Sequence, residues 1–232
     1  MYHNFIFDLY GTLVDIHTNE KKPSLWKKLA LFYSFQGAAY TGQELRRRYR
    51  QLEAAARTAP SPYACPEICA ADIFRTLYTE KGIQPTEALL TATGQFFRIE
   101  SLNTLQCYPA SIDTLQNLHT KGCGVYLLSN AQRIFTEYEL RSLGLWELFD
   151  GILISSDEGC CKPDPPDRIL ITRKLISPDV FFIHAKTATQ ITTEIMEPVR
   201  NCIRDAPQFF PRHALPPGKS VPSLVESGSS SS

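Results

Sequence analysis

Four side chains that could take part in chemistry follow short apolar runs of this sequence. Asp8 stands near the end of one run, Ser129 and Asn130 follow a second, and Lys162 lies in the loop after a third. A carboxylate with an ordinary pKa of about 3.9 is ionised at neutral pH, so it needs positioning rather than a general base to act as a nucleophile. A lysine ammonium group beside it can neutralise negative charge that develops during the reaction. A reactive carboxylate is one interpretation of these residues; singly, an aspartate before Gly-Thr can also cap a turn, and Ser-Asn can also begin a helix.

The apolar runs are expected to be the buried strands that position these side chains. Strands are predicted at 5–9, 124–128, 151–154 and 180–183. The intervening patterns predict helices at 109–121, 135–143 and 167–175. Strands that alternate with helices in this way imply right-handed βαβ units, a parallel, doubly wound sheet and the α/β fold class. Ligands of such sheets bind beyond the carboxyl ends of the strands, where the four polar side chains are expected.

A long helical stretch interrupts this alternation. Apolar residues at helical spacing between Ser24 and Glu100 predict four helices without an intervening strand, which is typical of an inserted helical domain. We therefore expect a discontinuous α/β core at 1–14 and 101–200 and a helical domain at 15–100. The prolines and serines of 201–232 predict a poorly ordered tail.

Composition narrows the function classes. Lys+Arg and Asp+Glu both number 24, which argues against nucleic-acid binding through bulk positive charge. No apolar stretch approaches the roughly 18 residues of a membrane span, and no basic region precedes the first apolar run. The seven cysteines include no Cys-x-x-Cys pair, so we expect reduced thiols. These features predict a cytoplasmic protein with neither a nucleic-acid nor a membrane partner; they give no oligomeric state.

Three motifs in order resemble those of the haloacid dehalogenase (HAD) superfamily of hydrolases. They are Asp8-Leu9-Tyr10-Gly11-Thr12-Leu13, Leu127-Leu128-Ser129-Asn130 and Lys162-Pro163-Asp164-Pro165. The resemblance extends from residue 5 to about 183 and implies a Rossmann-like core, with the helices of 15–100 as a cap domain. It implies hydrolysis of a small phosphorylated metabolite.

The resemblance also assigns roles to single residues. Asp8 would be the nucleophile, forming an aspartyl-phosphate that water then hydrolyses. Ser129 would donate a hydrogen bond to a phosphoryl oxygen, and Lys162 would neutralise charge in the transition state. Thr12 would form a hydrogen bond with the nucleophile, and both Thr12 and Asn130 would contact the substrate.

Magnesium is the cofactor that the resemblance implies, held by Asp8 and by the backbone carbonyl of Tyr10. Two positions differ from the family's phosphatases. Tyr10 stands where they carry a second aspartate as general acid, and no carboxylate follows Ile183 until Glu194, where the family supplies acidic ligands. The Asp-x-Tyr-Gly-Thr form is similar to that of the family's 2-haloacid dehalogenases, which attack carbon and need no metal. A carbon–halogen hydrolase and a catalytically impaired homologue therefore stay open as alternatives.

Overall fold

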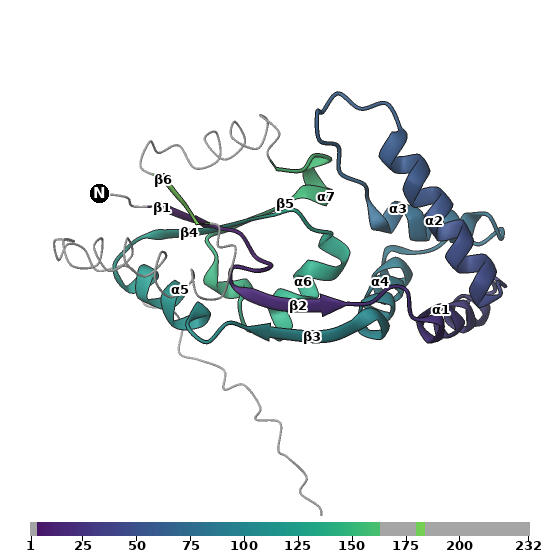
Figure 1. The fold of residues 1–232 in the computed structure, drawn as a ribbon, viewed down its shortest axis with the longest axis horizontal. Coiled ribbons are helices and arrows are strands. Elements are labelled where there is room, and N and C mark those ends of the chain that lie inside the picture. The colour runs from purple at the N-terminus through teal and green to yellow at the C-terminus, as the bar shows by residue number, and fades with distance from the viewer. Residues whose placement is uncertain (1–3, 163–179, 184–232) are drawn as a thin grey trace, which may run out of the picture.

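The sheet that the apolar runs predict is present. The structure is a computed structural model that describes residues 4–162 and 180–183. Its parallel sheet has the order β5-β4-β1-β6, shown in Figure 1. The strands are β1 (Asn4–Phe7), β4 (Gly124–Ser129), β5 (Gly151–Ile154) and β6 (Val180–Ile183). The predicted α/β fold class is confirmed. The helix expected at 167–175 and the tail expected at 201–232 lie outside the described residues.

Two helices cover one face of this sheet (Figure 1). They are α5 (Ser111–Thr120), which precedes β4, and α6 (Arg133–Ser142), which joins β4 to β5. Because side chains alternate between the faces of a strand, one set of strand residues faces these helices. The main core cluster therefore combines strand and helix residues, among them Phe5, Phe7, Val125, Leu127, Leu115, Leu118 and Leu140. A smaller cluster joins Ile6, Leu128 and Leu153.

The four helices expected between 24 and 100 are confirmed, and they pack around a core of their own at one end of the molecule (Figure 1). They are α1 (Pro23–Phe35), α2 (Gly42–Thr58), α3 (Ala70–Thr79) and α4 (Glu87–Ser101). Their core is rich in aromatic side chains, including Trp26, Tyr33, Phe74, Tyr78 and Phe97. We call residues 23–101 the helical segment.

One helix begins later than the sequence suggests. Proline is common at the first position of a helix, so Pro66 predicts a helix start. However, α3 begins at Ala70. Pro66 instead pairs with Cys160 in an antiparallel bridge. The backbone of Glu67 donates to the Gly159 carbonyl at 3.0 Å. Tertiary pairing therefore overrides the local helical preference here.

Two strands that the sequence analysis does not predict form a ribbon below the sheet in Figure 1. They are β2 (Val14–Thr18) and β3 (Leu102–Cys107), which pair antiparallel with a shift in register between His17 and Thr18. The boundary expected between residues 14 and 15 falls inside β2. The ribbon therefore carries both passages of the chain between the sheet and the helical segment. Two short elements follow later, η1 (Trp146–Leu148) and α7 (Ser155–Glu158).

Among the described residues, no helix combines the length and the apolar character that crossing a bilayer requires.

Candidate active site

Asp8 and Lys162 meet at the carboxyl ends of the strands. Asp8 directly follows β1 and is 7 % exposed, and its backbone N–H donates to the carbonyl of Ile183 at 3.0 Å. Lys162 follows α7, and its Nζ donates to Asp8 Oδ1 at 2.5 Å and to the carbonyl oxygen of Leu128 at 2.9 Å. The register of β1 with β4 places Asp8 beside Leu128, so one ammonium group spans the ends of two strands. The structure thus brings together the carboxylate and the cation that the sequence suggests.

Asn130 fixes the loop that carries Lys162. Its Oδ1 accepts from the backbone N–H of Lys162 at 2.7 Å, and its Nδ2 donates to the Lys162 carbonyl at 3.2 Å. Ser129, the last residue of β4, is 1 % exposed and pairs with Ile154 of β5. In this structure Asn130 positions the lysine, while its expected role in substrate binding stays a prediction, as does the phosphoryl contact of Ser129.

A tight turn follows Asp8 and holds Thr12. The carbonyl of Leu9 accepts backbone hydrogen bonds from Thr12, Leu13 and Val14 at 3.2, 2.8 and 3.0 Å. Gly11 has a φ of 79°, a left-handed backbone conformation. Residues with a Cβ adopt this conformation only at an energetic cost, which explains the glycine here. Thr12 is fully buried in this turn. We call residues 8–14 the nucleophile turn, after the role expected of Asp8.

Tyr10 directs its hydroxyl group toward α6. That group forms hydrogen bonds with Thr136 Oγ1 at 2.9 Å and with Glu139 Oε2, to which it donates. Burial raises the pKa of Tyr10 far above its ordinary value, and the negative charge of Glu139 adds to the rise. Tyr10 therefore keeps its proton at any ordinary pH and is a poor proton donor to a leaving group.

The described residues include only part of the magnesium site that the resemblance implies. Among residues 4–162 and 180–183, no three His, Cys, Asp or Glu side chains lie close enough together to hold a metal ion. Asp8, whose Oδ1 accepts a hydrogen bond from Lys162 Nζ, and the backbone carbonyl of Tyr10 are the two ligands expected in this part of the chain. The positions after Ile183, including Glu194, lie outside the described residues, so magnesium binding stays a prediction.

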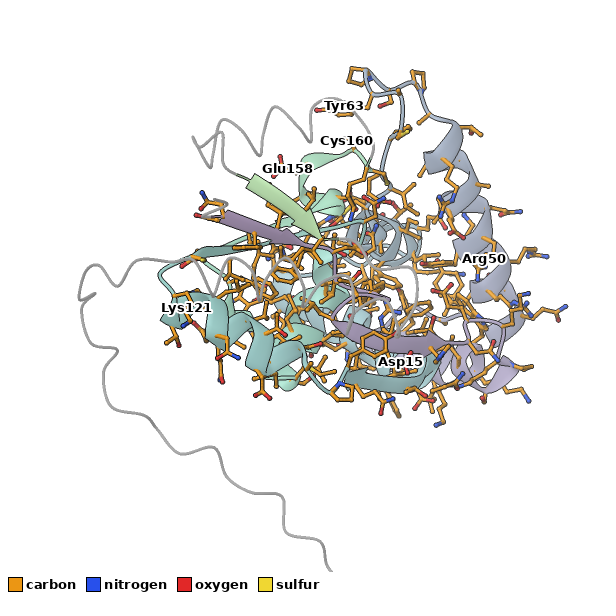
Figure 2. The ribbon with its side chains drawn as sticks, turned by 60° about the vertical axis from the view of Figure 1, so that its left-hand side comes forward. Asp15, Arg50, Tyr63, Lys121, Glu158 and Cys160 are labelled. Atoms are coloured by element: carbon orange, nitrogen blue, oxygen red, sulfur yellow. The ribbon has the colours of Figure 1, made fainter. Side chains whose placement is uncertain are left out.

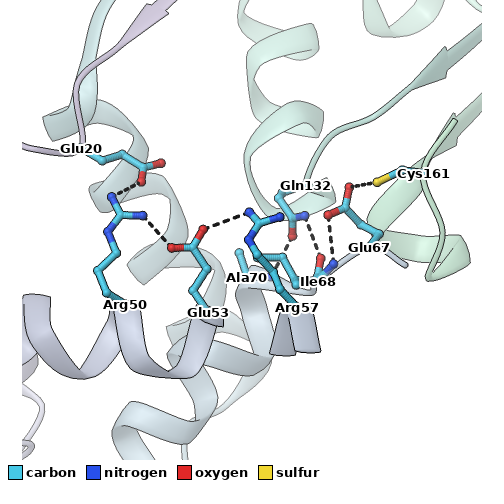
Figure 3. Close-up of polar contacts among 9 residues, drawn as sticks. All are labelled: Glu20, Arg50, Glu53, Arg57, Glu67, Ile68, Ala70, Gln132 and Cys161. Atoms are coloured by element: carbon cyan, nitrogen blue, oxygen red, sulfur yellow. Dashed lines mark hydrogen bonds and ion pairs between the residues drawn. The ribbon is translucent and has the colours of Figure 1, made fainter. Parts of the chain in front are cut away.

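A linker of the helical segment reaches the same edge of the sheet. Figure 2 shows Tyr63 and Cys160 near each other, in the linker between α2 and α3 and in the loop after α7. In Figure 3, Glu67 of this linker accepts a hydrogen bond from the Cys161 thiol at 3.1 Å. Glu67 also accepts from Ser155 Oγ at 2.6 Å. Sequence reasoning missed Glu67, since a single acidic residue in a proline-containing linker gives no signal of its partner.

Gln132 makes a second contact between the linker and the edge of the sheet. Its side chain accepts from the backbone N–H of Ala70 at 2.7 Å and donates to the carbonyl of Ile68 at 2.8 Å (Figure 3). Gln132 lies two residues beyond Asn130. The helical segment is therefore attached to the loop that bears part of the candidate site.

With this geometry in place, comparison with known proteins identifies the class. Residues 2–183 match the family model of haloacid dehalogenase-like hydrolases, and the chain belongs to this family. It is a member of the HAD superfamily of hydrolases.

Among curated proteins the chain is similar to (S)-2-haloacid dehalogenase 4A of Burkholderia cepacia, with 28 % identity over 167 residues. The match covers 69 % of this chain and 64 % of the length of that protein.

Solved structures of the superfamily also resemble this one. L-2-haloacid dehalogenase from Xanthobacter autotrophicus has 23 % identity and a TM-score of 0.42, covering 78 % of this chain and 69 % of that one. A predicted phosphoglycolate phosphatase from Haemophilus somnus has 18 % identity and a TM-score of 0.41, covering 78 % and 76 %. Because both TM-scores lie below 0.5, nothing about the substrate of this chain follows from them.

Proposed function

We propose that this HAD-family hydrolase cleaves the carbon–halogen bond of a small 2-haloacid through an ester on Asp8. The observation that carries the proposal is the placement of Tyr10. The Tyr10 hydroxyl group forms hydrogen bonds with Glu139 and Thr136, and burial raises the pKa of Tyr10. Tyr10 is therefore a poor general acid. An alkoxide that leaves phosphorus needs a proton, and losing a general acid typically slows such a reaction about 10²–10⁴-fold. A halide leaves carbon as a stable anion and needs none.

A further observation supports attack on carbon. The curated relative at 28 % identity is a 2-haloacid dehalogenase. Phosphoester hydrolysis, the first expectation from the sequence, is the competing outcome.

The proposed reaction has two steps. A carboxylate oxygen of Asp8 attacks the halogen-bearing carbon, an ester bond forms, and the halide leaves with the bonding electron pair. Water then attacks the carbonyl carbon of the Asp8 ester, which releases the 2-hydroxyacid and a proton and restores the carboxylate. Lys162 orients the Asp8 carboxylate before the attack on carbon. During hydrolysis of the ester, Lys162 stabilises the negative charge that develops on the oxygen atoms of Asp8.

The experiment measures chloride from (S)- and (R)-2-chloropropionate and phosphate from a phosphoester panel, with and without Mg²⁺. We expect chloride release from one enantiomer without added metal. A single turnover with enzyme in excess, in water enriched in oxygen-18, should place the label on Asp8, because water attacks its carbonyl carbon. An aspartyl-phosphate would instead place the label on phosphate, because water attacks phosphorus.

Two variants at carboxylates make the experiment specific. Asp8→Asn should abolish chloride release, whereas Asp113→Asn, which changes an exposed carboxylate on α5, should leave it intact. Phosphate release with label on phosphate would replace the proposal with the phosphatase function. No turnover in either assay, and no difference between wild type and Asp8→Asn, would favour an impaired homologue.

A further inference from the structure

Glu139 is a buried carboxylate on a helix face that otherwise packs against the core. It is 4 % exposed, and the neighbouring buried residues of α6 are Phe135, Thr136 and Leu140. One oxygen, Oε2, accepts the hydrogen bond of the Tyr10 hydroxyl group. The other, Oε1, lies 2.9 Å from Arg98 Nε of α4. The carboxylate therefore links the nucleophile turn, α6 and the helical segment.

Arg98 is placed to balance this buried charge. Its guanidinium group lies 4.3 Å from the centre of the Phe135 ring, a cation–π distance, and its side chain is 16 % exposed. The Nε and Oε1 atoms lie at ion-pair distance without the alignment of a hydrogen bond. An ion pair with this geometry stabilises the protein less than a well-aligned pair does, although both charges are still removed from water.

Stability alone does not account for this arrangement. Replacing a buried ion pair by packed apolar side chains is often neutral or stabilising, so an apolar residue at 139 would serve the core equally well. An apolar residue would not, however, bond the Tyr10 hydroxyl group. Tyr10 is two residues from Asp8 and belongs to the same tight turn around the Leu9 carbonyl.

We infer that Glu139 is a positioning residue that acts through Tyr10 to fix the nucleophile turn, and that Arg98 ties the helical segment to this turn by pairing with Glu139. The catalytic part of this inference rests on the proposed role of Asp8 as nucleophile. The positioning part concerns the turn alone and is measured separately.

The first measurement is amide hydrogen exchange of the peptide that covers residues 8–14. In the wild type, the amides that bond the Leu9 carbonyl are expected to exchange slowly. Glu139→Gln and Tyr10→Phe should each accelerate this exchange under native conditions. Glu137→Gln, which removes a surface carboxylate paired with Arg141 on the same helix, should not.

The second measurement is steady-state turnover of 2-chloropropionate. Misplacing a reacting group by about 1 Å can cost about 100-fold in rate. We therefore expect Glu139→Gln to lower kcat about 10- to 100-fold, with KM close to the wild-type value. The same substitution should have no further effect on kcat in a Tyr10→Phe background, because Glu139 acts through the hydroxyl group that this variant lacks.

The outcomes separate this inference from the proposed function. Unchanged exchange of residues 8–14 in both folded variants would overturn it, whatever reaction the enzyme catalyses. Faster exchange with an unchanged kcat, or independent effects of the two substitutions on kcat, would overturn the catalytic part. If the wild type releases no chloride, the proposed function fails, and the exchange measurement still decides whether Glu139 fixes the turn. Should Glu139→Gln not fold, Tyr10→Phe, which removes one hydroxyl group, gives the same readout.

Discussion

Removing Lys162 should expose how strongly the candidate site depends on one ion pair. The side chains of Asp8 and Lys162 are 10 % and 20 % exposed, and their charged atoms lie 2.5 Å apart. At an effective dielectric constant of about 20, Coulomb attraction at this distance is about 7 kcal/mol, and desolvation offsets part of it. Breaking a buried pair by removing one partner typically costs about 3–5 kcal/mol, since the other charge stays buried. We expect Lys162→Met to lower the free energy of unfolding by about 3 kcal/mol.

The assay is a double-mutant cycle by urea unfolding, with Asp8→Asn as the second variant. Because the double variant removes both charges of the pair together, it should lose about 2 kcal/mol less than the sum of the two single losses. The matched control is Lys28→Met, which breaks an exposed pair with Glu100 at 2.8 Å and should cost less than about 1 kcal/mol. Single losses that add to within about 0.5 kcal/mol would refute the argument that Asp8 and Lys162 stabilise each other.

Three further predictions concern the thiol, a helix cap and a helix contact. Burial, with the hydrogen bond to Glu67, raises the pKa of Cys161 from 9.0 to about 12, so alkylation of this thiol should stay slow at pH 9. The native state also keeps this proton longer than the unfolded state, so the thiol's contribution to stability is lost as pH rises from 9.0 toward 12. Thr86→Ala removes the N-cap of α4 and should cost about 1 kcal/mol in thermal unfolding. Gly94→Ala places a Cβ 2.5 Å from Ile134 Cγ1 and should cost about 1–3 kcal/mol in urea unfolding.

Each of these predictions has a control that could contradict it. Cys161→Ser should reduce the alkaline loss of stability, and an equal loss in both proteins would assign that loss to other groups. Thr86→Ser retains the capping oxygen and should preserve stability. Ile134→Ala should relieve the clash in Gly94→Ala; if the double variant is no more stable than the additive sum, the clash is not the cause.

The sequence was sufficient to predict the parallel sheet and the proximity of Asp8 and Lys162 in the candidate site. Apolar runs bounded by turns define the strands, and parallel strands bring their carboxyl ends to one edge, which is why Asp8 and Lys162 could be expected to meet. The β2–β3 ribbon was missed because its strands are short and contain polar residues. In addition, the two strands are separated in the sequence by the whole helical segment.

Glu67 and Glu139 were also missed, since each depends on a contact between elements that are distant in sequence. A signal did exist for Glu139: it stands four residues after Phe135 on the buried face of a helix, where a carboxylate requires a partner. The sequence does not, however, indicate that this partner is Tyr10 or Arg98.

The ribbon of β2 and β3 has a mechanical consequence. Both covalent connections of residues 23–101 leave through strands that are hydrogen-bonded to each other, so the connections cannot swing independently. Rotation of the helices would bend one paired strip, most easily at the irregular step between His17 and Thr18. Any movement of the helical segment would therefore be coupled to bending of this ribbon.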